Sequence, residues 1–171
     1  DRGAILPAGH SADAVYWMSS VGKWISSSYY MDELPDWLIK INENNPSANY
    51  LKGEWKMKNE FIHNLDTMYL TSGASAIKTT PFGNTILNDL AIEILKKEKL
   101  GQGKTTDILT ISFSSTDYIG HQYGPHAAEI KDTYIKLDKD IEKLLRTIDN
   151  IVGFESVVVF LTADHGVVSE P

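Results

Sequence analysis

The chain contains no cysteine and no long apolar segment. The lack of cysteine excludes a disulfide framework and any metal site built on thiolates, so a metal ion would need histidine, carboxylate or hydroxyl ligands. No run of about 18 apolar residues occurs, so no membrane span is expected. Positive charge is in the minority, and the formal net charge of −7 argues against a broad nucleic-acid surface.

What the chain does contain is typical of a globular protein. Its 171 residues are 42% hydrophobic and 23% charged, which excludes disordered and fibrous classes. A chain of this length can bury one hydrophobic core. It opens at Asp1 without a basic and apolar leader, and it closes at Pro171 without a visible cap or tail. We therefore expect residues 1–171 to be one internal fragment of a larger catalytic domain.

The second half of the chain has a clear periodic pattern. Apolar residues at helical spacing predict one helix that carries residues 86–95 and a second from about 126 to 148. Residues 107–113 and 157–162 are rich in β-branched and apolar residues, which is typical of strands. This order of elements predicts an α/β fold with a parallel sheet.

The first half is less regular. Residues 11–79 mix aromatic, polar and glycine residues with little periodicity, apart from one helix expected shortly after Asp32. We expect this stretch to form an irregular, cap-like insert beside an α/β core over residues 80–171. His63 is expected at the surface of this insert, and Asn84 is expected to serve the start of its own helix.

Acid and imidazole side chains follow both predicted strands. Asp117 and His121 come after the first strand, and Asp164 and His165 come directly after the second. Ligands of open α/β sheets bind beyond the carboxyl ends of the strands, so we expect these four residues to converge. Two carboxylates and two imidazoles suit a divalent ion such as zinc, and pairs from two strands make a second ion plausible.

Each pair also has a simpler interpretation. An Asp-His dipeptide at a strand end is commonly a loop feature, and Asp117 with His121 could be a turn carboxylate and a surface imidazole. The joint pattern favours a metal site, because both pairs follow the two clearest strands. The hydroxyl groups of Ser114, Ser115 and Thr116 lack a nearby base, so we expect them to support Asp117 by hydrogen bonds.

Two motifs carry a resemblance to a known family. They are the segment STDYIGHQYGP over residues 115–125 and the segment TADHG over residues 162–166. With them the sequence resembles the alkaline phosphatase superfamily, in the branch of the type I phosphodiesterases and nucleotide pyrophosphatases. It is most similar to the phosphate-irrepressible alkaline phosphatases, whose flanking segments residues 1–10 and 80–84 also resemble.

The resemblance implies a fold and a set of site residues. The fold would be part of a three-layer sandwich with a mostly parallel sheet. Asp117 and His121 match two ligands of one zinc ion, and Asp164 and His165 match two ligands of another. Arg2 matches an arginine that grips the phosphate oxygens, a task that suits its planar fork of donors. The threonine or serine nucleophile and the remaining zinc ligands would lie outside this chain.

The implied activity is hydrolysis of phosphate monoesters through two zinc ions, in the intact protein and not in the fragment alone. A phosphodiesterase or nucleotide pyrophosphatase would use the same metal ligands with a different leaving-group pocket. A non-catalytic metal- or ligand-binding module of the same fold is the alternative from another class. The expected partner is a small phosphate ester, and the family implies a periplasmic or secreted protein. The sequence leaves the oligomeric state open.

Overall fold

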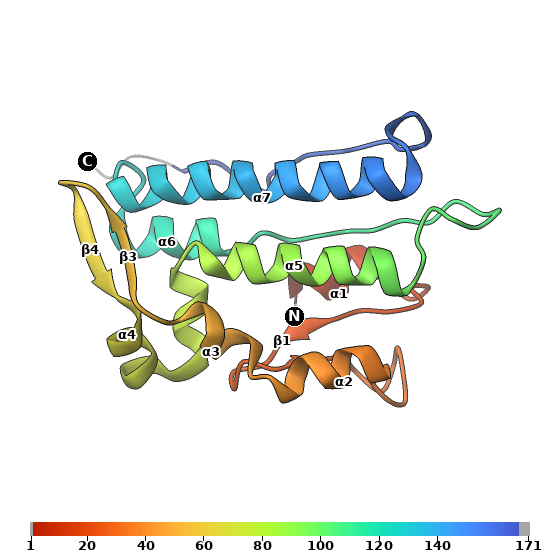
Figure 1. Ribbon diagram of the computed structural model, residues 1–171, viewed down its shortest axis with the longest axis horizontal. Coiled ribbons are helices and arrows are strands. Elements are labelled where there is room, and N and C mark those ends of the chain that lie inside the picture. Colours follow the sequence, from red (N-terminus) through yellow and green to blue (C-terminus); the bar gives the residue numbers. More distant parts are fainter. Residues whose placement is uncertain (1, 168–171) are drawn as a thin grey trace.

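The computed structural model describes residues 2–167, and for Arg2 it describes the backbone alone. The elements in chain order are α1 (Arg2–Ala8), β1 (Trp17–Met18), β2 (Trp24–Ile25), α2 (Asp36–Glu43), α3 (Pro46–Tyr50), β3 (Glu54–Met57), β4 (Phe61–Asn64), α4 (Leu65–Ser72), η1 (Gly73–Thr79), α5 (Phe82–Lys97), α6 (Ser115–Tyr123), α7 (Ala128–Val152) and η2 (Phe154–Ser156). Two antiparallel hairpins, β1–β2 and β3–β4, are the sheets within these residues. Figure 1 shows α5, α6 and α7 above α2, α3 and α4, with the β3–β4 hairpin at one side.

The two long helices predicted from periodicity are present. α5 covers residues 82–97, and α7 runs from residue 128 to residue 152, slightly later than expected at both ends. α7 ends at Gly153, whose φ of 86° lies in the left-handed region that favours glycine. α5 packs against α7 through Ala91, Ile92 and Leu144, which are all buried. These two packed helices are the main structural elements of the second half of the chain.

The two predicted strands do not form a parallel sheet within residues 2–167. Residues 107–113 and 157–162 have no hydrogen-bonded strand neighbour there, and they are not assigned as strands. In Figure 1 both are long unpaired traces that run in the same direction, one between α5 and α6 and the other after α7. Ile108 is 84% exposed and Phe160 is 89% exposed. A strand requires a neighbour for its backbone groups, so the apolar pattern alone does not produce one.

Residues 11–79 fold into short elements that share one core with α5. In β3–β4 the register pairs Trp55 with His63. Side chains buried in this core include Trp24, Leu38, Leu51, Trp55 and Leu65, together with Ile86, Leu90 and Ile119 from α5 and α6. The helix expected shortly after Asp32 is α2 (Asp36–Glu43), whereas most of the other elements are too short to give a periodic pattern, so the sequence looked irregular here.

Candidate functional site

Two of the expected metal ligands lie on one face of α6. Asp117 and His121 are one helical turn apart, and the Nε2 atom of His121 lies 3.5 Å from Oδ1 of Asp117. Both side chains are exposed, whereas Ile119 between them is fully buried and anchors the helix. The regular helix α6 provides this proximity.

The other two ligands reach the same place from the segment after α7. The Nε2 atom of His165 lies 3.6 Å from Oδ1 of Asp117 and 3.7 Å from Oδ2 of Asp164. The Asp117 carboxylate therefore lies next to imidazoles from two separate parts of the chain. The structure brings all four predicted side chains into one connected group.

The imidazole of His165 is oriented by its own loop. Its Nδ1 atom lies 3.0 Å from the carbonyl oxygen of Gly166, which can only accept, so Nδ1 donates the hydrogen bond. This contact raises the pKa of His165, and the charges of Asp164 and then Asp117 raise it further. With the hydrogen on Nδ1, the Nε2 lone pair of the neutral ring faces the two carboxylates.

The donor atoms suit zinc in their chemistry and spacing. Zinc binds nitrogen and oxygen ligands at about 2.0–2.1 Å, which places neighbouring donors of a tetrahedral site about 3.3 Å apart. The separations of 3.5–3.7 Å are close to that value. Within residues 2–167, no three His, Asp or Glu side chains gather around one point that could hold a metal ion. The four side chains therefore do not form a complete shell for one ion by themselves.

Arg2 begins α1, and its side chain lies outside the described residues. The next residue, Gly3, packs against the segment that leads into α6. A Cβ atom on Gly3 would lie 2.6 Å from Oγ of Ser112 and 3.7 Å from Oγ of Ser114. The backbone beside Arg2 thus approaches the segment that leads to Asp117.

His63 is not a free surface residue as expected. Its Nε2 atom lies 2.9 Å from Oε1 of Glu129 on α7, and its side chain is only 25% exposed. The ring also lies against Trp55 and Tyr123 with centroids 5.1 Å away in each case. The aromatic residues of β3 and β4 were the sequence signal for this cluster. The contacts of the His63 ring with Trp55 and Tyr123 join the β3–β4 hairpin to the end of α6.

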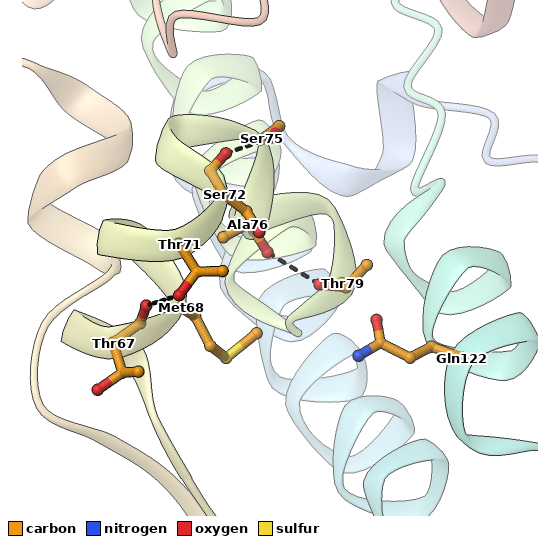
Figure 2. A pocket seen from close by; sticks show the side chains of 8 residues that line it. All are labelled: Thr67, Met68, Thr71, Ser72, Ser75, Ala76, Thr79 and Gln122. Carbon is orange, nitrogen blue, oxygen red and sulfur yellow. Dashed lines mark hydrogen bonds between the residues drawn. The ribbon is translucent and has the colours of Figure 1, made fainter.

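A separate hollow of about 420 Å³ lies between α4, η1 and α6. Figure 2 shows hydroxyl groups around it, with Gln122 reaching toward it from α6. The hydroxyls of Thr71, Ser75 and Thr79 donate to backbone carbonyls three or four residues earlier in the chain. No cationic side chain lines this hollow among the described residues, so it does not suit a phosphate group.

Comparisons with known proteins agree with the resemblance of the motifs. The model of the type I phosphodiesterase/nucleotide pyrophosphatase family matches residues 3–171. A protein named calcium-transporting ATPase from Myroides odoratus is 39% identical, over 100% of this chain and 36% of its own length. Alkaline phosphatase PhoV from Synechococcus elongatus is 36% identical, also over 100% of this chain and 36% of its length.

The fold is also similar to that of a solved structure. The crystal structure of wild-type alkaline phosphatase PafA matches with a TM-score of 0.83 and 33% identity, over 90% of this chain and 34% of that one. This match confirms the predicted α/β fold class, although the described residues contain no parallel strand pair. The chain spans about a third of the length of these relatives. It belongs to the type I phosphodiesterase/nucleotide pyrophosphatase family.

Proposed function

We propose that the intact protein hydrolyses phosphate esters and that this chain contributes two ligands to each of two zinc ions. Asp117 and His121 would hold one ion, and Asp164 and His165 would hold the other. The observation that carries the proposal is the position of the Asp117 carboxylate, 3.5 Å from the His121 imidazole and 3.6 Å from that of His165. Exposed acid and imidazole groups from two distant segments have no reason to converge for packing alone, since none of them is buried.

When bound, zinc supplies Lewis-acid stabilisation of the oxygens around phosphorus. The residues of this chain have simpler tasks. Asp117 and Asp164 supply negative charge, and the carbonyl of Gly166 holds the His165 ring so that Nε2 is available as a ligand. Arg2 would bind the non-bridging phosphate oxygens, for which a guanidinium is well shaped. The nucleophilic threonine or serine would come from outside residues 1–171.

A phosphate monoester is the preferred substrate class in this proposal. Two of the similar proteins, PhoV and PafA, are named alkaline phosphatases, and PafA is similar both in sequence and in fold. The family model instead carries the name of phosphodiesterases, which makes a diester the alternative. A periplasmic or secreted location is proposed on the same family membership.

The test compares an aryl phosphate monoester with an aryl phosphate diester, using the intact zinc-loaded protein. We expect faster turnover of the monoester, loss of activity in a chelator, and recovery when zinc is returned. Asp117→Asn should lower kcat/KM by at least about 100-fold, in line with loss of a metal ligand. The control is Asp138→Asn, an exposed carboxylate on α7, which should leave turnover unchanged. Faster diester turnover would reject the monoesterase. A zinc-loaded protein without activity on any phosphate ester would reject the enzyme and favour a binding module.

A further inference from the structure

Asn84 lies in the first turn of α5 but its side chain serves another helix. It is 1% exposed, and the N-cap of α5 is Pro81. Its Oδ1 atom accepts a hydrogen bond from the backbone N–H of Ser115 at 3.1 Å. Its Nδ2 atom donates to Oγ1 of Thr116, also at 3.1 Å. The amide therefore binds the first two residues of α6. The sequence had suggested that it would serve the start of its own helix, and that expectation is wrong.

These contacts replace a missing cap. The first N–H groups of a helix have no partner within it, and an N-cap side chain usually accepts from one of them. Ser114, the N-cap of α6, makes no such side-chain hydrogen bond. Asn84 supplies the acceptor from the neighbouring helix, so the start of α6 is attached to α5.

The neighbouring glycine allows the two helices to meet this closely. A Cβ atom on Gly83 would lie 2.1 Å from Oγ of Ser115 and 2.7 Å from the backbone oxygen of Ile77. No side chain fits at this position without moving α6 or η1. Gly83 and Asn84 together form a surface, here called the α6 seat, on which the first turn of α6 rests.

We propose that Asn84 is a positioning residue for the metal ligands of α6, an inference that rests on the function proposed above. Asp117 directly follows Thr116, and His121 lies one turn later on the same rigid helix. A shift of the first turn moves both ligands relative to His165, which comes from a separate segment. Metal sites tolerate ligand displacements of only about 0.2 Å, so a looser seat weakens the site.

Asn88 provides a matched control within the same helix. It lies one turn after Asn84 and is fully buried, yet neither atom of its amide has a hydrogen-bond partner within the described residues. Replacing Asn88 by alanine therefore removes the same volume and the same buried amide from α5. It breaks no side-chain hydrogen bond between α5 and the first turn of α6.

The experiment uses the intact protein and compares Asn84→Ala, Asn84→Asp and Asn88→Ala. Zinc affinity is measured by competition with a chromogenic chelator, and hydrogen exchange is measured at the Ser115 amide. We expect Asn84→Ala to lower zinc affinity about tenfold and to expose that amide, as for other residues that orient metal ligands. Asn84→Asp keeps an acceptor for Ser115 and can accept from the Thr116 hydroxyl, so it should restore most of the affinity. Asn88→Ala should retain the zinc affinity of the unsubstituted protein.

Thr116→Val gives a second measurement that does not depend on how well Asn84→Ala folds. It removes the acceptor for Nδ2 of Asn84 with little change of shape, and it should lower zinc affinity by less than Asn84→Ala. In the Asn84→Ala background it should have no further effect. The inference is wrong if Asn84→Ala and Asn88→Ala bind zinc equally well while the unsubstituted protein binds zinc and hydrolyses the ester. If the unsubstituted protein does neither, the proposed function itself is wrong and the inference falls with it.

Discussion

The indole Nε1 of Trp55 donates a 2.7 Å hydrogen bond to Oδ2 of Asp132, and both side chains are buried. Trp55 lies on β3 and Asp132 lies on α7, so the bond joins the hairpin to the longest helix (Figure 1). Lys136, one turn further along α7, forms an ion pair with the same carboxylate oxygen. Two donors therefore replace part of the water that the Asp132 carboxylate loses on burial.

Trp55→Phe should destabilise the fold, because it removes one of these two donors from a buried carboxylate. The expected loss is about 1–3 kcal/mol in the free energy of unfolding, measured by urea denaturation. Trp37→Phe is the matched control, since the Trp37 indole donates to Glu98 in an exposed position. It should cost less than about 1 kcal/mol. Equal losses in the two variants would contradict the role assigned to the buried bond.

Gly83→Ala should destabilise the fold although alanine is the better helix former. Helix propensity favours alanine by about 1 kcal/mol in a helix interior, but the new methyl group would overlap the Ile77 carbonyl, which belongs to the backbone. A net loss of about 1–3 kcal/mol is expected from denaturation. Gly120→Ala on α6 is the control, because its nearest atom would be Cδ1 of Ile130 at an ordinary 3.6 Å. That variant should be as stable as the parent protein or more so. A stabilised Gly83→Ala variant would show that the α6 seat is not tightly packed.

The stability of the fold should depend on the ionisation of Asp140. Burial raises the pKa of this carboxyl, the nearby charge of Asp89 raises it further, and the Thr85 hydroxyl and Lys143 act in the opposite direction. A raised pKa in the folded state means that the protonated form is favoured there. The stabilisation that protonated Asp140 gives to the folded state is present at pH values below the unfolded-state pKa. It is lost as pH rises through the folded-state pKa.

Asp140→Asn removes this dependence and leaves an oxygen that can accept from Thr85. We expect the variant to gain stability relative to the parent protein as pH rises from about 4 to 7, measured by urea denaturation at each pH. A difference that is constant over this range, or that changes in the opposite direction, would contradict the raised pKa.

Sequence patterns predicted the parts of the fold that repeat along the chain. α5 and α7 are long enough to show several turns of helical spacing, and the four acid and imidazole residues stood out because they follow two apolar segments. A parallel sheet was also predicted from those segments, but they do not pair within residues 2–167, because a strand forms only when a neighbour binds its backbone. Among the short elements before α5, helical spacing predicted α2 (Asp36–Glu43), whereas the others gave no periodic pattern.

The role of Asn84 illustrates a different limit. Asparagine near the start of a helix is commonly a cap for that helix, so the local pattern pointed to α5. The true partners of its amide, Ser115 and Thr116, lie about thirty positions further along the chain. Such a contact depends on how two helices pack, and no local spacing encodes it. For the same reason, local spacing did not predict the contact between His63 and Glu129.

The central claim is that the two pairs of ligands serve two different zinc ions. Elemental analysis of the intact, zinc-loaded protein tests it most directly, with variants in which both members of one pair are alanine. We expect two zinc ions per chain in the parent protein, one when Asp117 and His121 are replaced, and one when Asp164 and His165 are replaced. A zinc content that is the same in the parent and in both variants would contradict it.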